Sequence, residues 1–227
     1  TFALAATSIG LAIVVALATA YVATLPGAGP LRSFFRTLPS FMVSLPGFWI
    51  AILLLQFFSF RLGWVNVVDP TPLEGLILPT LTLAVPMAAP LMQVLIRSID
   101  EVRAQPFVQV VRARGASEAR IFWRDVLRNS LLPAITMAGL LFGELVGGAV
   151  VTETVFGRAG LGSLTVNAVS SRDMPVLLGV VLIAATAYVV INLIVDLLYP
   201  VLDVRLRDQA AAETANTPAT TAKEAVR

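Results

Sequence analysis

Charged side chains are rare in this chain, and they concentrate in two places where they could act. Five arginines lie in the stretch VVRARGASEARIFWRDVLRNSLLP, from Val110 to Pro133, and guanidinium groups bind carboxylates, phosphates and lipid head groups. Glu144 and Glu153 follow in apolar sequence, where a charged side chain near mid-membrane costs about 2.5–3.5 kcal/mol and is a candidate for function. Histidine and cysteine are absent, which excludes thiolate or imidazole metal ligands and Cys-based or His-based nucleophilic catalysis.

The overall composition is that of a membrane protein. Hydrophobic residues make up 57% of the 227 residues and charged residues 13%, and the mean hydropathy is +0.86, far from the values of soluble domains. The formal net charge of +2 provides no broad basic surface for nucleic acid. The chain contains no GxxxxGK[ST] sequence, so it has no P-loop for ATP, and a partner would have to supply any energy.

Five apolar segments are long enough to cross a membrane as helices. A bilayer core of about 30 Å takes about 20 helical residues, and the segments run roughly over residues 2–25, 38–60, 76–96, 132–155 and 176–199. Prolines within the second and third segments remove backbone donors and predict kinks, which neighbouring helices tolerate in a bundle. These prolines are Pro39, Pro46, Pro79, Pro86 and Pro90. The predicted fold is an all-α, polytopic transmembrane helical bundle.

Basic residues are divided unevenly between the two sides of the predicted membrane. The loops of one side hold Arg32, Arg36, seven arginines within 97–128, and the basic residues of 205–227. The loops of the other side hold three arginines, Arg61, Arg158 and Arg172. Because loops rich in lysine and arginine stay in the cytoplasm, the first side is predicted to be cytoplasmic and Thr1 to lie outside. We therefore expect a sixth, N-terminal helix before Thr1 and a cytoplasmic C-terminus.

The last residues, 208–227, differ from the rest of the chain in composition. They are rich in alanine and threonine and have no periodic apolar face. Such a segment buries too little apolar surface to offset its conformational entropy. We predict a disordered cytoplasmic tail.

The basic stretch, residues 105–131, is predicted to form two short helices that lie against the membrane face. Gly115 separates them, because glycine readily adopts the left-handed backbone that ends a helix. Ser117 is placed to cap the second helix, and Glu118 lies in its first turn, where a negative charge suits the helix dipole. On the first helix, the apolar residues are expected on one side and the polar residues toward water. The apolar ones are Phe107, Val108, Val110 and Val111, and the polar ones are Gln109, Arg112 and Arg114.

Arginines at intervals of four residues give the second helix one basic stripe, made of Arg120, Arg124 and Arg128. Two kinds of partner fit this pattern. The arginines could meet anionic lipid head groups, with Trp123 at the membrane interface, or the two helices could dock on another protein. The spacing by itself favours neither.

Several motifs resemble those of one transporter family. FVQVVRARGASEARIFWRDVLRNSLLP is similar to the cytoplasmic loop of ABC-transporter permeases of the dipeptide, oligopeptide and nickel family, whose usual pattern is close to YVRTARAKGLS followed by RNALLP. SLPGFWIAILLLQFFSFRLGW, ILPTLTLAVP, ETVFGRAGLG and INLIVDLLYPVLDVRLR extend the resemblance over nearly all of residues 1–207. The ETVF-to-GLG form resembles the first of the two permeases in such systems. The departures are Gln109 for a glutamate, Arg158 and Ala159 for a Trp-Pro pair, and Val204 for a proline.

The resemblance implies a fold and a role for each part of the chain. The fold would be that of a type I ABC importer permease, with residues 1–207 as its transmembrane domain. A coupling segment would dock in a cleft of an ATPase subunit. It would consist of Phe107, Val108, Gln109, Val110, Val111, Arg112, Ala113, Arg114, Gly115, Ala116 and Ser117. ATP and Mg would bind to the partner ATPases, so this chain would hold no cofactor or metal and would not be an enzyme.

The resemblance also implies partners, location and substrate. The partners would be a second homologous permease, two ATP-binding subunits or domains, an extracytoplasmic substrate-binding protein and the lipid bilayer of a bacterial or archaeal inner membrane. The substrate would be a di- or oligopeptide, with nickel or another chelated metal, or glutathione, as alternatives. A non-transporting scaffold whose basic loop binds lipid stays open. An intramembrane enzyme is disfavoured because the chain lacks histidine, cysteine and a catalytic cluster.

Polar residues within the apolar segments are the candidates for the pathway or gate. Glu153 is nine residues beyond Glu144, a rotation of about 900°, so the two face opposite sides of an unbroken helix. We hypothesise that Glu144 lies on the pathway or a tight packing surface, and that Glu153, with Gly160 and Gly162, sets the outer gate. The alternative is that Glu144 is protonated or hydrogen-bonded in a helix contact and that Glu153 is wet.

Two further sets of residues are predicted to serve helix packing. Gly139, Gly143 and Gly147 recur every four residues and would let another helix approach closely. Asn192 and Asp196 lie one turn apart near the cytoplasmic end of the last segment, with Tyr199 on a similar face. An aspartate there opposes the helix dipole, so we expect it to pair with Arg205 or with an arginine of the cytoplasmic segment.

Overall fold

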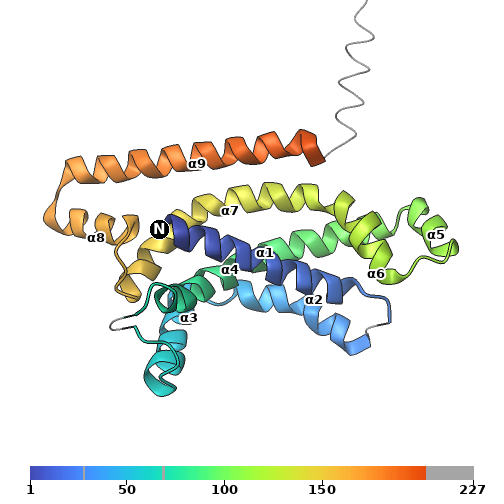
Figure 1. Cartoon of the computed structure of the whole chain (residues 1–227), viewed down its shortest axis with the longest axis horizontal. Helices are drawn as coiled ribbons and strands as arrows, with labels where there is room; N and C mark the ends of the chain where they lie inside the picture. Colours follow the sequence, from blue (N-terminus) through green and yellow to red (C-terminus); the bar gives the residue numbers. More distant parts are fainter. Residues whose placement is uncertain (28, 68–69, 203–227) are drawn as a thin grey trace, which may run out of the picture.

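The computed structural model describes the backbone of residues 1–27, 29–67 and 70–202, and every element in these ranges is a helix (Figure 1). This confirms the all-α class. The elements are α1 (Phe2–Thr24), α2 (Gly29–Val43), α3 (Gly47–Leu54), the π-helical η1 (Leu55–Arg61), α4 (Glu74–Arg103), α5 (Pro106–Ala113), α6 (Glu118–Arg120), the π-helical η2 (Ile121–Val126), α7 (Leu127–Val155), α8 (Leu161–Ser171) and α9 (Met174–Leu202). The predicted tail, 208–227, lies outside the described residues.

The core of the bundle is formed by α4 between α1 and α7. Alanines of α1 recur at intervals of three or four residues, at Ala12, Ala16, Ala20 and Ala23, and all four are fully buried. Their small side chains let α4 approach closely, which is the favoured way to pack helices where lipid provides no hydrophobic driving force. Met92 of α4 belongs to the same apolar cluster and is also fully buried.

The second predicted span is broken, which corrects the expectation of one kinked helix over residues 38–60. Within the described residues, four helices are long and apolar enough to cross a membrane, and the pair Gly29–Val43 and Gly47–Arg61, bent by 101°, makes a fifth if its two helices count as one broken span. The break falls at Pro46, which has ψ of 132°, because proline lacks an N–H and disfavours the helical conformation of the residue before it. Pro79, Pro86 and Pro90, in contrast, lie inside the continuous α4.

The second of the two expected short helices is likewise not separate. The chain is helical from Glu118 through α6 and η2 into α7, so this segment is the start of the fourth span. Phe122 is fully buried, and its ring lies 4.8 Å from that of Tyr21 on α1. Burial of this apolar surface against the bundle explains why the segment packs along it and does not lie flat.

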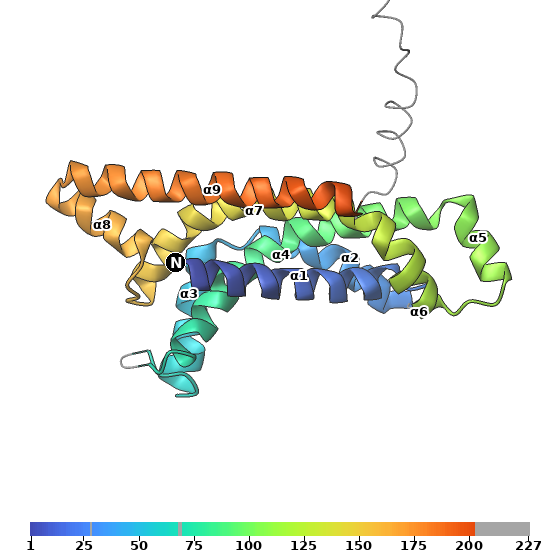
Figure 2. The ribbon, with the colours of Figure 1, turned by 45° about the horizontal axis from the view of Figure 1, so that its top comes forward.

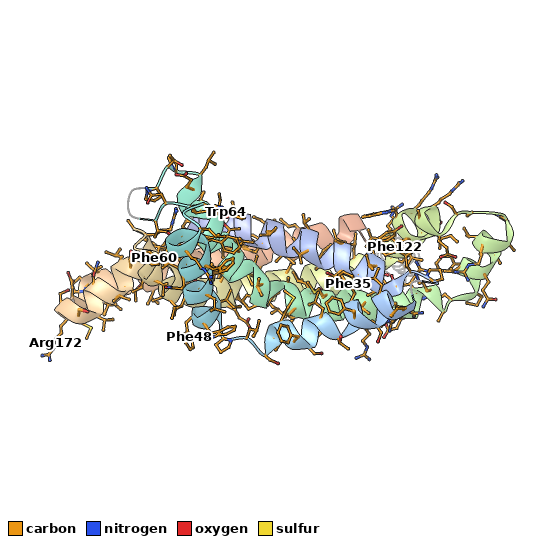
Figure 3. All side chains as sticks on the ribbon, turned by 90° about the horizontal axis from the view of Figure 1, so that it is seen from below. Phe35, Phe48, Phe60, Trp64, Phe122 and Arg172 are labelled. Carbon is orange, nitrogen blue, oxygen red and sulfur yellow. The ribbon has the colours of Figure 1, made fainter. Side chains whose placement is uncertain are left out.

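The two ends of the bundle carry different elements. Figures 1 and 2 show α5 and α6 at one end, and the N-terminus of α1, the C-terminus of α7 and α8 at the other. In Figure 3, Phe122 lies at the first end, while Phe48, Phe60 and Trp64 lie toward the second and Arg172 at its tip. Every basic residue of 97–128 thus belongs to the α5–α6 end or the helices that lead to it.

The last helix, α9, is exposed along most of its length. It runs beside α7 (Figure 2) and contacts α7 and α8, but almost none of its apolar length is buried against the rest of the described chain. It is also the most apolar of the candidate spans. An apolar helix with so little protein contact requires lipid or another subunit around it.

Candidate functional site

The coupling segment begins with α5 and ends in a glycine turn. Pro106 occupies the first turn of α5, where its missing N–H removes no helical bond. Gly115 has φ of +82°, and a Cβ placed there would have no neighbour within 4 Å. The glycine is therefore required by the left-handed backbone and not by lack of space. Ser117 then caps α6 by accepting the N–H of Arg120 at 3.4 Å, as the sequence predicts.

The apolar residues of α5 do not all lie on one side of the helix, in contrast to the expectation from the sequence. Val108 is 0% exposed and packs with Ile121 and Phe122, but Val110 is 52% exposed. Residues two apart on a helix point about 200° apart, so Val108 and Val110 cannot share one side. The expectation that Val110 belongs to the inner apolar face was wrong.

Glu118 joins three helices at the turn. Its Oε2 accepts from Nη1 of Arg103 at 3.0 Å, and its Oε1 accepts from Nε of Arg112 at 2.8 Å. Arg103 ends α4 and Arg112 lies in the last turn of α5. Arg112, expected to point only to water, therefore helps to fix α5 relative to α4 and α6.

Glu153 lies in the last turn of α7, and its carboxylate reaches the start of α8. It is 1% exposed, so the alternative of a wet side chain was wrong. Its Oε2 accepts the backbone N–H of Gly162 at 2.8 Å and of Ser163 at 3.2 Å, and its Oε1 accepts from the Thr1 hydroxyl at 2.5 Å. Free N–H groups and the positive end of the dipole at a helix N-terminus stabilise such a carboxylate. Glu153 thus holds α8 to the end of α7.

Gly160 and Gly162 are required by this contact. A Cβ on Gly160 would overlap the Glu153 carboxylate, and one on Gly162 would overlap the backbone of Val150 and lie 2.9 Å from Glu153 Oε2. The adjacent Arg158 donates from Nη1 to the carbonyl of Gly75 at the start of α4. The three expected gate residues therefore form one tight junction between α7 and α8, and their role as a gate stays a prediction.

Glu144 lies away from this junction on an exposed strip of α7. The strip consists of Leu140, Glu144, Gly147 and Val151, which recur at helical spacing. Glu144 has no hydrogen-bond or ion-pair partner among the residues that the structure describes. Glu144 and Glu153 do not share a wall, as the sequence predicts, and the contribution of Glu144 to a pathway stays a prediction.

The three spaced glycines of α7 lie in two different environments. Added Cβ atoms would lie 3.2 Å from Val195 at Gly139 and 2.9 Å from Tyr188 at Gly143, whereas Gly147 has nothing within 4 Å. Gly139 and Gly143 therefore face α9, whereas the Cα–H side of Gly147 where a side chain would stand meets no atom of the described chain. The open space at Gly147 belongs to the same strip as Glu144.

Asn192 and Asp196 lie on α9. The Asn192 amide donates to the carbonyl of Tyr188 at 2.9 Å, and its Oδ1 would lie 3.6 Å from a Cβ added to Gly139. Asp196 is exposed and has no ion-pair partner within the described ranges. The expected partner Arg205 and the side chain of Tyr199 lie outside the described residues, so the pairing of Asp196 stays a prediction.

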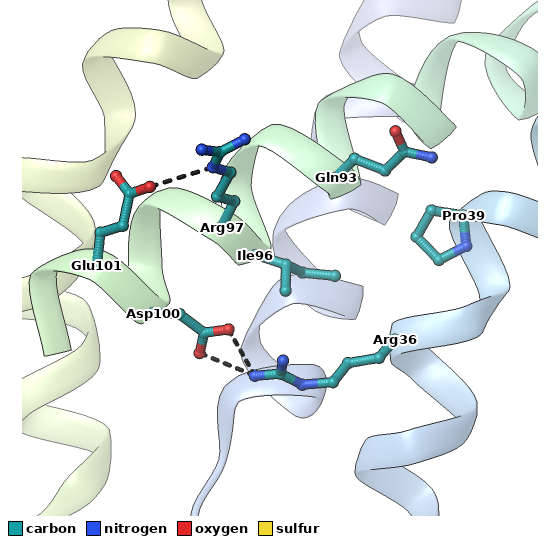
Figure 4. Close-up of a pocket in the computed structure, with 7 residues that line it drawn as sticks. All are labelled: Arg36, Pro39, Gln93, Ile96, Arg97, Asp100 and Glu101. Atoms are coloured by element: carbon teal, nitrogen blue, oxygen red, sulfur yellow. Dashed lines mark hydrogen bonds and ion pairs between the residues drawn. The ribbon is translucent and has the colours of Figure 1, made fainter. Parts of the chain in front are cut away.

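Besides the two ion pairs of Glu118, sequence reasoning missed a pair that joins α2 to α4 (Figure 4). Arg36 of α2 donates from Nη2 to both carboxylate oxygens of Asp100 on α4, at 2.8 and 2.7 Å, and from Nε to the carbonyl of Ala23 at 3.0 Å. It thereby links α1, α2 and α4 beside a pocket of about 370 Å³. Arg36 and Asp100 are 64 residues apart, and no local pattern connects them.

Replacing Arg36 by Gln and Asp100 by Asn, singly and together, should show modest coupling. Both side chains are about one-third exposed, so solvent screening limits the pair to about 1 kcal/mol even though Nη2 contacts both carboxylate oxygens. A double-mutant cycle on the thermal stability of the purified protein measures this coupling. The exposed i, i+4 pair Arg97–Glu101 is the matched control and should couple less. Equal coupling in the two cycles would contradict a linking role for Arg36.

Comparisons with known proteins place this arrangement in a family. Residues 8–208 match the model of the binding-protein-dependent transport system inner membrane component. The glutathione transport system permease protein GsiC of Escherichia coli (strain K12) is 38% identical over 165 residues, which are 73% of this chain and 54% of GsiC. GsiC of Salmonella choleraesuis (strain SC-B67) is also 38% identical over 165 residues. The chain thus spans about half the length of the curated relatives it matches.

The fold is also found among solved structures. A structure of the inward-facing MetNI methionine ABC transporter contains a chain that matches with a TM-score of 0.71 at 18% identity, over 89% of this chain and 92% of that chain. A second crystal form matches with a TM-score of 0.69. At this identity the likeness shows the fold, and the family match covers most of the residues. The chain belongs to the family of binding-protein-dependent transport system inner membrane components.

Proposed function

We propose that this chain forms half of the translocation pathway of an ATP-driven importer, together with a second, homologous permease. The family match over residues 8–208 carries the proposal. The uncovered surface of α9 and the strip of Leu140, Glu144, Gly147 and Val151 leave room for a second permease and a pathway beside α7. An unpaired carboxylate such as Glu144 needs water or a polar partner at membrane depth, and a pathway wall provides it.

In this proposal, α5 is the element that docks in an ATPase subunit. It lies at the end of the bundle (Figure 1), with Val108 turned inward and Gln109, Val110 and Arg114 exposed. The ion pairs of Glu118 with Arg103 and Arg112 connect it to α4 and α6. ATP and Mg bind to the partner ATPases. Closure of the ATPases would move α5 and, through these contacts, the helices that decide which side the pathway opens toward.

The proposed substrate is a short peptide delivered by an extracytoplasmic binding protein. Two relatives that match this chain are named as glutathione permeases, and glutathione is itself a tripeptide. Both observations support a peptide over a nickel chelate. Glutathione and dipeptides are therefore the first substrates to test.

Reconstitution tests the proposal directly. The full-length permease is co-expressed with its neighbouring permease and ATPase genes, purified and placed in proteoliposomes with the cognate binding protein outside. We expect uptake of labelled glutathione or a dipeptide that requires both ATP and the binding protein. A folded permease that co-purifies with no ATPase, or uptake that does not depend on ATP, would overturn the importer role and favour a scaffold.

The proposed orientation places α5 in the cytoplasm and the α8–α9 turn outside. Because the chain contains no cysteine, single cysteines at Arg114 and Arg172 report on each side cleanly. A membrane-impermeant maleimide should label Arg172→Cys in intact cells or spheroplasts, and Arg114→Cys only after permeabilisation. Labelling in the reverse order would invert the proposed topology.

A further inference from the structure

The arginines near the coupling segment fall into two classes. Arg36, Arg97, Arg103 and Arg112 each pair with a carboxylate. The four arginines of residues 114–128 have no carboxylate partner within 4 Å among the residues that the structure describes, and all are exposed. They are Arg114, Arg120, Arg124 and Arg128. Four unpaired like charges on one short segment indicate a negatively charged partner outside the chain.

Aromatic contacts place this segment at the level of the membrane boundary. Trp123 is 54% exposed, and its ring stacks on Tyr21 with centroids 6.0 Å apart. Tyr21 lies in the last turn of α1, a candidate span that ends at Thr24. Tryptophan and tyrosine are enriched where a membrane meets water. Trp123 thus marks the depth of the lipid head groups.

The depth of the arginines distinguishes lipid from a docked protein. Arg124 follows Trp123 directly and lies at head-group depth. Arg128 is four residues further toward the membrane centre, about 6 Å along the helix, where a cytoplasmic protein does not reach. Its long side chain can return its charge to the phosphate level. On the cytoplasmic side, Arg114, Arg120 and Arg124 line a pocket of about 330 Å³ in which Asp125 is the one carboxylate.

We propose that Trp123, Arg124 and Arg128 bind the phosphate of an anionic phospholipid in the inner leaflet, with Arg120 and Arg114 at the cytoplasmic rim of the site. Guanidinium groups form paired, charge-assisted hydrogen bonds with phosphate, while the excess positive charge disfavours the choline of a zwitterionic lipid. The bound lipid would hold the α6–η2 end of the fourth span at the membrane surface. The proposal depends on the orientation given above but not on the importer function.

Photo-crosslinking tests the site in the intact transporter. The purified complex is reconstituted with equal trace amounts of a photoactivatable phosphatidylglycerol or phosphatidylcholine, and label on the permease subunit is measured after a denaturing gel. In the wild type, phosphatidylglycerol should label the subunit several-fold more than phosphatidylcholine. The Arg124→Gln/Arg128→Gln variant should bring this ratio close to one, because an arginine near the surface contributes up to about 5-fold to the binding of an anionic lipid and this variant removes two.

Two further variants make the outcome decisive. Arg124→Lys/Arg128→Lys keeps both charges and should keep most of the preference, which separates charge from folding. Arg61→Gln/Arg172→Gln removes two charges from the opposite end of the bundle and should leave the ratio unchanged. A wild-type ratio of one, or an unchanged ratio in Arg124→Gln/Arg128→Gln, would overturn the proposal. Loss of the ATPase subunit from that variant without a change in lipid ratio would assign the arginines to protein docking and would also overturn it.

Discussion

Replacing Val108 by Asp should detach α5 from the bundle, while replacing Val110 by Asp should leave the chain folded. Val108 is 0% exposed and packs with Ile121 and Phe122, so an aspartate there would be buried without a partner. Breaking up a buried apolar contact with an unpaired charge costs several kcal/mol, on the order of 3 or more. Val110 is 52% exposed, and the same substitution there should change stability by about 0.5 kcal/mol or less.

The two variants form a matched pair, since they introduce the same charge two residues apart on one helix. Membrane abundance and a single gel-filtration peak measure folding, and the amount of co-purified ATPase measures docking. Val108→Asp should reduce both, whereas Val110→Asp should keep the folded permease and lose the ATPase. If Val110→Asp retains the ATPase and ATP-coupled uptake, then the exposed face of α5 is not the docking surface.

Replacing Gly162 by Ala should open the junction between α7 and α8. The added Cβ would overlap the backbone of Val150, and a backbone cannot move aside as a flexible side chain can. Separation of the helices would also remove the N–H groups of Gly162 and Ser163 from the Glu153 carboxylate. We expect a loss of about 1–3 kcal/mol from overpacking alone, and more where the buried carboxylate loses its donors.

Gly179→Ala is the matched control for this substitution. It introduces the same methyl group into a helix at a position with nothing within 4 Å, where alanine should be neutral or slightly stabilising. The two variants are compared by heating the purified proteins and measuring the temperature at which each loses its monodisperse gel-filtration peak. A Gly162→Ala protein as stable as Gly179→Ala would show that the α7–α8 junction is not tightly packed.

Much of the fold followed from local features of the sequence. The apolar segments and their approximate ends were predictable because the hydrophobicity of a segment is the sum over its own residues and does not depend on which helices pack against it. The break at Pro46 was missed because proline signals a possible interruption, while the packing around it decides between a kink and a turn. Pro86 and Pro90 carry the same signal and yet lie within an unbroken helix.

The candidate site was predictable to a smaller extent. Gly115 and Ser117 were identified because a left-handed turn and a helix cap are local requirements. The outward position of Val110 was also implicit in helical spacing, once Val108 is known to be the buried residue. The burial of Glu153 was not, since it depends on α8 folding back onto the end of α7.

The all-α class, the apolar lengths that can span a membrane and the glycine turn after α5 can be derived from the residues alone, because each depends on residue type and spacing within one segment. The contact of Arg36 with Asp100, the capping of α8 by Glu153 and the packing of Phe122 on Tyr21 appear only in the folded bundle. These contacts join residues from different helices, and which helices become neighbours depends on the packing of the whole bundle. The arginines of the basic stretch are likewise divided by tertiary contacts. Glu118 pairs with Arg103 and Arg112, whereas Arg124 and Arg128 have no carboxylate partner among the described residues and are proposed to bind lipid.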